Sequence, residues 1–146
     1  MTESFQGKIV VVTGGAHGIG KTICSEFEKA GASVCIFDLL ENPYFQGDLA
    51  KEQDLVQFSQ KVIAQYGHVD VLVNNAMKSM GGLSSCGFDD FNYALKVGVT
   101  APYMLTRLFL PAFAPGASII NISSSRDRMS QPDTESYTAA KGGIAA

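Results

Sequence analysis

The stretch Lys8–Lys21, KIVVVTGGAHGIGK, decides how this chain folds. Ile9 to Val12 form a continuous apolar run rich in β-branched residues, which is typical of a strand covered on both faces of a parallel sheet. Thr13-Gly14-Gly15 ends that run, and after Gly18 apolar residues recur at spacings of three and four, as on one face of a helix. We therefore predict a strand, a glycine-rich turn and a helix, in that order.

This order of elements is suited to binding phosphate. Backbone N–H groups and the positive end of the helix dipole point at whatever lies over the turn. The glycines at positions 14, 18 and 20 matter because a Cβ atom would keep a pyrophosphate away from the backbone. Glycine clusters also end strands without binding anything, so the turn alone leaves the function open.

The composition of the 146 residues is that of an ordinary globular protein, with 46% apolar and 17% charged residues, and we expect residues 1–146 to form one domain. A formal charge of −3 argues against nucleic acid as a partner. The three cysteines lack the spacing of a disulfide framework or a metal site, so we expect no metal. Neither a signal peptide nor an apolar run of membrane-spanning length is present, so we expect a cytoplasmic protein without a membrane partner.

A second strand, Ser33–Phe37, ends at an acidic residue. Asp38 lies 18 residues after Gly20, close to where a dinucleotide-binding unit places a carboxylate for the adenosine ribose hydroxyls. An acid after a strand is often only a solvated loop residue, but its distance from the glycine turn favours the functional interpretation. The segment from Asp38 to Asp48 is too short for a crossover helix and a strand, so we expect a shortened connection.

Beyond this connection, strand and helix patterns alternate to position 146. Pro102 should kink or divide the long helical pattern at 89–113, which Pro111, Pro115 and Gly116 close. The predicted elements are a helix at Glu52–Tyr66, a strand at Val69–Val73, a loop at Met77–Gly87, one or two helices at 89–113, a buried-type strand at Ala117–Ile122, a polar loop at 126–136 and a helix from Tyr137. Such alternation predicts an α/β fold, a Rossmann-type doubly wound parallel sheet between two layers of helices.

Three polar residues near the end of the sequence can support acid/base chemistry. Tyr137 and Lys141 stand at i and i+4, so on a helix they share one face. A nearby ammonium favours the phenolate and lowers the pKa of a tyrosine toward neutral pH. Ser124 follows the last predicted strand and could hydrogen-bond a substrate oxygen at the same place. A tyrosine–lysine pair is also a common surface contact, but strands of an open α/β sheet end at a shared ligand-binding crevice.

Taken together, these motifs resemble the classical short-chain dehydrogenase/reductase family. The resemblance covers essentially the whole sequence and rests on four motifs in register. They are Thr13-Gly14-x-x-x-Gly18-Ile19-Gly20, Asn74-Asn75-Ala76, Ser124 and Tyr137-x-x-x-Lys141. The family implies reversible hydride transfer between a nicotinamide cofactor and a small-molecule alcohol or ketone. It also implies a homodimer or homotetramer when the protein is complete.

The resemblance assigns a role to each candidate residue. Tyr137 is the acid/base, Lys141 lowers the tyrosine pKa and holds the nicotinamide ribose, and Ser124 orients the substrate oxygen. The cofactor-binding residues that it implies are Gly14, His17, Gly18, Ile19, Gly20, Asp38, Asp48, Leu49, Asn75, Tyr137 and Lys141. No Arg or Lys stands just before Gly18, where His17 is found, or directly after Asp38 to offset its charge, so Asp38 predicts NAD in preference to NADP.

The sequence departs from the family at three places. Met77 stands where the family has glycine after Asn-Asn-Ala, and Gly98 stands where an asparagine is usual, which puts the family's proton relay to lysine in question. The family's chains also continue well past the lysine. We therefore expect the amino-terminal portion of a longer enzyme, inactive as a 146-residue fragment. The alternative is a non-catalytic nucleotide-binding module, whereas an extended-type epimerase or dehydratase is disfavoured by the glycine spacing.

Overall fold

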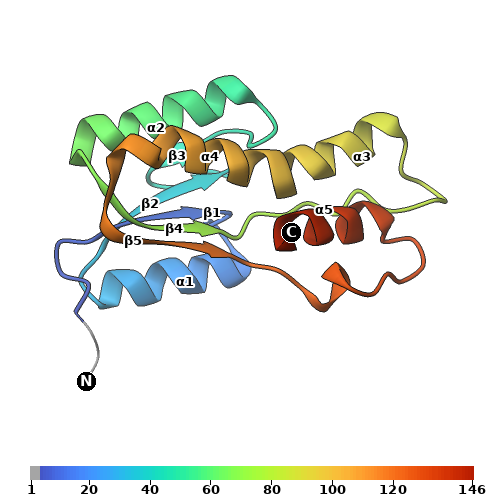
Figure 1. Ribbon diagram of the computed structural model, residues 1–146, viewed down its shortest axis with the longest axis horizontal. Helices are drawn as coiled ribbons and strands as arrows, with labels where there is room; N and C mark the ends of the chain where they lie inside the picture. The colour runs from blue at the N-terminus through green and yellow to red at the C-terminus, as the bar shows by residue number, and fades with distance from the viewer. Residues whose placement is uncertain (1–3) are drawn as a thin grey trace.

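A parallel sheet of five strands lies at the centre of the computed structural model, which describes residues 4–146 (Figure 1). The strands are β1 (Ile9–Thr13), β2 (Ser33–Asp38), β3 (Phe45–Gln46), β4 (Val69–Asn74) and β5 (Phe113–Asn121). They are ordered β3-β2-β1-β4-β5, and every adjacent pair is parallel. The predicted Rossmann-type sheet is confirmed.

Helices cover both faces of this sheet. Their bounds are α1 (Gly18–Lys29), α2 (Glu52–Tyr66), α3 (Phe88–Leu95), α4 (Ala101–Phe109) and α5 (Glu135–Ala145). Short helical turns are the π-helical η1 (Lys96–Thr100) and the 3₁₀ turns η2 (Leu110–Ala112) and η3 (Ser125–Asp127). In Figure 1, α1 lies on one face, α2 and α4 on the other, and α5 beyond the carboxyl ends of β4 and β5. Within residues 4–146, no helix has both the length and the apolar character that crossing a membrane requires.

Alternation along β1 explains why the core has two parts. Ile9 and Val11 point toward α2 and α4, where they join a buried cluster around Phe58 and Phe109. Val10 and Val12 point the other way and pack with Cys24 and other residues of the α1 side. All four apolar residues of the strand are buried, as expected for a central parallel strand covered on both faces.

The connection after β2 is short, as predicted. Only the two residues of β3 pair with β2 before the chain reaches Asp48, and no helix intervenes. This shortened connection between β2 and α2 leaves Asp38 and Asp48 at the same end of the sheet, where both line one cavity.

The end of α2 is also where the sequence predicted it. The helix ends at Gly67, whose φ of 75° places it in the left-handed region that favours glycine at a helix C-terminus.

The region from 89 to 121 differs in part from the prediction. Pro102 marks a boundary, since it lies in the first turn of α4 after the π-helical η1. Pro111 lies in the 3₁₀ turn η2 directly after α4, as predicted, but the prediction that Pro115 and Gly116 close the helix was wrong, because β5 begins at Phe113 and includes both. A register shift in the pairing with β4, between Val69 and Val71, accommodates this segment.

The prediction of a buried-type strand at Ala117–Ile122 was also wrong in its burial. Among the described residues β5 is an edge strand that pairs with β4 alone, and Ile119 and Ile120 remain 44% and 40% exposed. The apolar composition of β5 resembles that of a central strand. The exposure of its side chains, however, depends on how many neighbouring strands and helices cover it. The helix with the Tyr-x-x-x-Lys motif, α5, begins at Glu135, two residues before Tyr137.

Candidate active site

The turn between β1 and α1 has the shape of an anion cradle. Gly14 has a φ of 70°, and a Cβ there would lie 2.9 Å from the Cα of Ala76. A Cβ on Gly20 would lie 2.0 Å from the carbonyl oxygen of Gly14, so only glycine fits at this position. Helix α1 then begins at Gly18 without a side-chain cap and without an acidic residue in its first turn. Its free N–H groups are available to a phosphate.

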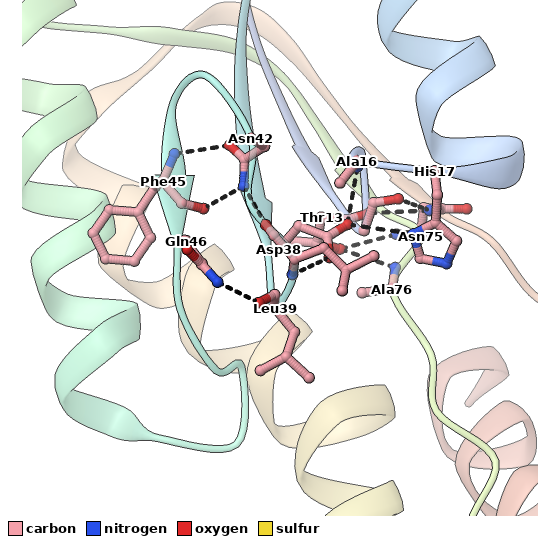
Figure 2. A network of polar contacts seen from close by, with 12 residues as sticks. Thr13, Ala16, His17, Asp38, Leu39, Asn42, Phe45, Gln46, Asn75 and Ala76 are labelled. Carbon is pink, nitrogen blue, oxygen red and sulfur yellow. Dashed lines mark hydrogen bonds and ion pairs between the residues drawn. The ribbon is translucent and has the colours of Figure 1, made fainter.

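Polar contacts from β2 and β4 hold this turn in place (Figure 2). The Asn75 side-chain N–H group donates to the carbonyl oxygens of Thr13 and Gly14, at 3.0 and 3.2 Å. The Thr13 hydroxyl oxygen accepts the backbone N–H groups of Asn75 and Ala76, both at 3.1 Å. Asn75 therefore also shapes the turn in which the expected cofactor phosphates would lie.

Asp38 contributes to the same network. Its side chain is 4% exposed, and its two oxygens accept the backbone N–H groups of Ala16 and Leu40, each at 2.9 Å. The exposed ring of His17 lies 3.9 Å from one of these oxygens. A carboxylate can accept about four hydrogen bonds, so Asp38 keeps acceptor capacity for a ribose hydroxyl while it fixes the turn.

These groups lie along a cavity of about 480 Å³ at the carboxyl ends of the strands. Its walls include every residue that the sequence analysis assigned to the cofactor: Gly14, His17, Gly18, Ile19, Gly20, Asp38, Asp48, Leu49, Asn75, Tyr137 and Lys141. Residues at or just after the carboxyl ends of β1, β2 and β4 thus meet residues of α5 at one place, as expected for an open α/β sheet. The glycine cradle and the uncapped helix fit the pyrophosphate of a dinucleotide.

Tyr137 and Lys141 form the end of the cavity contributed by α5. The Lys141 Nζ atom lies 5.7 Å from the centroid of the Tyr137 ring and donates to the Ile122 carbonyl oxygen at 2.5 Å. Lys141 is only 5% exposed, and this burial lowers the pKa of its ammonium group. Tyr137 and Lys141 thus lie on the same face of α5, as their spacing predicted.

The predicted catalytic serine, Ser124, does not itself line the cavity. Ser123, not Ser124, is among the residues that line the cavity, and its hydroxyl donates to Asp127 at 3.2 Å. The Ser124 hydroxyl oxygen accepts the backbone N–H group of Arg126 at 3.2 Å, as an N-terminal cap of η3. The Ser124 hydroxyl group donates a hydrogen bond to no residue among 4–146. Because Ser124 does not line the cavity, its hydroxyl would have to change position before it could donate to a substrate oxygen there.

The two departures from the family motifs meet in space. Met77 lines the cavity, and its sulfur would lie 2.8 Å from a Cβ added to Gly98 in the π-helical turn η1. The Cβ of Ala140 on α5, which is fully buried, would lie equally close to it. The methionine thus occupies space that is free because residue 98 is glycine. Close packing explains both replacements at once.

Sequence reasoning missed several residues of the cavity wall. Tyr93 and Val97 come from α3 and η1, and no local motif marks them. Met77 and Lys78 directly follow the Asn-Asn-Ala motif, so their position was the available signal. The remaining wall residues that were not predicted are Leu39, Leu40, Gly47, Ala76, Ile122 and Ser123.

Comparisons with known proteins agree with this geometry. The family model described as short chain dehydrogenase matches residues 8–146. The chain belongs to this family. It is 34% identical to an uncharacterized oxidoreductase of Thermotoga maritima and 32% identical to the L-fucose dehydrogenase of Mus musculus, in each case over 97% of the chain. It covers 62% and 58% of those two proteins, so it spans about three fifths of the curated relatives that it matches.

Solved structures agree with the fold and extend the comparison. An apo SCOR enzyme from Clostridium thermocellum superposes with a TM-score of 0.88 at 42% identity, over 97% of this chain and 63% of that one. A blue fluorescent protein from a metagenomic library, in complex with NADPH, superposes with a TM-score of 0.88 at 27% identity, over 97% and 66%. Membership of a family of oxidoreductases and the Rossmann-type fold therefore rest on both sequence and structure.

Proposed function

We propose that the protein of which this chain forms part is an oxidoreductase that interconverts an alcohol and a carbonyl compound with NAD as cofactor. The observation that carries the proposal is that the glycine cradle, Asp38 and the Tyr137–Lys141 pair line one cavity. Asp48 and Leu49, at the end of the short β2–α2 connection, would lie along the adenine. Lys141 would hold the nicotinamide ribose, and Asp38 the adenosine ribose.

In this proposal the chain's own residues handle the proton, while the bound nicotinamide gives or takes the hydride. The Tyr137 hydroxyl would donate a proton to the carbonyl oxygen during reduction and accept it from the alcohol during oxidation. Lys141 would place its positive charge on the same helix face, with its Nζ atom 5.7 Å from the centroid of the Tyr137 ring. Ser124 would hydrogen-bond the substrate oxygen, as the family motif implies, with Ser123 as the cavity-lining alternative.

NAD is proposed over NADP on the strength of Asp38. A 2′-phosphate would meet this carboxylate. Among residues 4–146 no Lys or Arg forms an ion pair with Asp38 to offset its charge, and only the His17 ring lies near it, at 3.9 Å. Several solved relatives hold the phosphorylated cofactor, among them a metagenomic short-chain oxidoreductase in complex with NADP, 30% identical to this chain. The choice between the two cofactors is thus a direct test of the role of Asp38.

The test is turnover by the full-length protein. NAD and NADP would be offered with a panel of secondary alcohols, ketones and aldose sugars, the last because relatives include L-fucose dehydrogenase. We expect a change in nicotinamide absorbance with NAD that Tyr137→Phe abolishes while NAD binding persists. NAD binding without turnover on any substrate would favour a nucleotide-binding module, and absence of dinucleotide binding would refute the proposal.

A further inference from the structure

Asp48 has two carboxylate oxygens in different environments. Oδ1 accepts the backbone N–H group of Ala50 at 2.9 Å and the hydroxyl of Tyr93 at 3.1 Å. Oδ2 accepts no hydrogen bond from any residue between 4 and 146. The Asp48 backbone N–H group donates to Asp54 at 2.8 Å, and the Asp48 carbonyl oxygen accepts from Lys51, which fixes the main chain around it. The carboxylate is therefore held by one oxygen and open at the other.

Tyr93 is well suited to hold this carboxylate. It reaches Asp48 from α3, 45 residues along the chain, and its ring packs against the core cluster on the α2 and α4 side. Burial, followed by the hydrogen bond to Asp48, raises the pKa of Tyr93, so the phenol stays a neutral donor at neutral pH. One donor is the Ala50 backbone in the turn before α2 and the other is the Tyr93 side chain on α3, so together they fix the rotation of the carboxylate about its Cβ–Cγ bond.

Asp48, which carries this open oxygen, lines the cavity together with Tyr93 and Leu49. A carboxylate oxygen accepts hydrogen bonds and donates none. The 6-amino group of adenine is a donor, whereas hypoxanthine and guanine carry an acceptor oxygen at that position. An oriented, unpaired carboxylate oxygen therefore suits a 6-aminopurine and opposes a 6-oxopurine.

We propose that Tyr93 is a base-selecting positioning residue, which turns Asp48 so that Oδ2 accepts the exocyclic amino group of the cofactor's adenine. The inference rests on the proposed function, in that a nicotinamide dinucleotide binds with its base beside Asp48. What it adds to that contact is Tyr93, a residue on α3 that no motif marks.

Binding, measured by calorimetry on the full-length protein, tests the inference without any need for turnover. The two ligands are NAD and nicotinamide hypoxanthine dinucleotide, which differ only in the base: the analogue carries a 6-oxo oxygen and an N1–H group where adenine has its 6-amino group and an unprotonated N1. We expect the wild-type protein to bind NAD about tenfold more tightly than the hypoxanthine analogue. Tyr93→Phe should weaken NAD binding several-fold and leave the affinity for the analogue nearly unchanged, so that the ratio falls toward one. The matched control, Tyr103→Phe, removes a hydroxyl from a tyrosine that is 65% exposed on α4 and should leave both affinities unchanged.

A second variant makes the test independent of any general weakening. In Asp48→Asn, the Ala50 and Tyr93 donors should select the amide oxygen at the Oδ1 position and leave the amide NH₂ group facing the base. This group would donate to a 6-oxo oxygen, so the preference should invert toward the hypoxanthine analogue. The double variant with Tyr93→Phe should show a weaker inversion or none.

The outcomes separate the inference from the function on which it rests. If the wild-type protein binds neither dinucleotide, the proposed function fails and the inference fails with it. If NAD binds but Tyr93→Phe leaves the ratio of the two affinities unaltered, Tyr93 is merely structural. Only the inference is then overturned. Thermal unfolding of each variant, monitored by circular dichroism, verifies that the proteins compared are folded.

Discussion

Replacement of Gly98 by asparagine, the residue usual in the family, should destabilise this protein. The new Cβ would lie 2.8 Å from the sulfur of Met77 and 2.8 Å from the Cβ of Ala140. Ordinary contacts between such atoms are about 3.5–4.0 Å, so roughly 1 Å of overlap must be relieved on each side. Met77 can shift, but Ala140 is part of the buried face of α5.

The expected loss follows from this overlap. Over-packing of a well-filled site costs about 1–3 kcal/mol, and the better helix propensity of asparagine than glycine returns only a few tenths of a kcal/mol. A net loss of about 2 kcal/mol corresponds to a fall in melting temperature of about 4–8 °C for a domain of this size. Met77→Ala should relieve part of it, so the losses in the double variant should be smaller than their sum by about 1 kcal/mol.

Thermal unfolding measures this coupling. The four proteins compared are the wild type, Gly98→Asn, Met77→Ala and the double variant. Gly87→Asn is the matched control, because a Cβ at Gly87 would meet nothing within 4 Å and asparagine caps helices well. The reasoning is refuted if Gly98→Asn melts like the wild type, or if the two losses simply add.

Three further predictions follow from the site and its surroundings. Tyr137→Phe should lower kcat by at least about a hundredfold with NAD affinity nearly unchanged, while Lys141→Met should reduce both; steady-state kinetics and calorimetry separate the two effects. Asp38→Ser should weaken NAD binding and relax discrimination against NADP, and should also lower the melting temperature, because the Ala16 N–H group loses its acceptor; equal affinity of the wild type for both cofactors would contradict the assignment. Asp70→Asn should cost about 1.5–3 kcal/mol at neutral pH. Burial raises the pKa of Asp70, but the Ile9 N–H group and Lys8 outweigh it and hold the pKa below its usual value. The carboxylate's contribution is therefore complete above about pH 4 and is lost as pH falls through the lowered pKa, so the deficit of the variant should shrink in acid, as measured by urea unfolding across pH.

The sequence predicted what depends on local pattern. The β-branched run of β1, the glycine turn and the end of α2 at Gly67 are set by neighbouring residues, and the structure has each where it was expected. The exposure of Ile119 was not predictable in this way, because an edge strand and a central strand have the same apolar composition. The start of β5 at Phe113 depends on pairing with Val69, which is distant in sequence.

The candidate site shows the same division. Spacing indicated Asp38 and Tyr137, and the family resemblance indicated Asn75, as residues of one site. Neither showed that Asp38 and Asn75 also hold the glycine turn. Met77 and Gly98 stood out as departures from the family motifs, and only their contact in space shows that each accommodates the other. Tyr93 has no sequence signal at all, since its role depends on a hydrogen bond across 45 residues.

The most direct test of the account is a crystal structure of the full-length protein with NAD at saturating concentration. The account predicts density for one dinucleotide along the described cavity, with its pyrophosphate over the turn at Gly18 and Gly20. Its adenine should lie beside Asp48, and its nicotinamide beside Tyr137 and Lys141. A dinucleotide bound elsewhere, or bound here in the reverse orientation, would contradict the central claim.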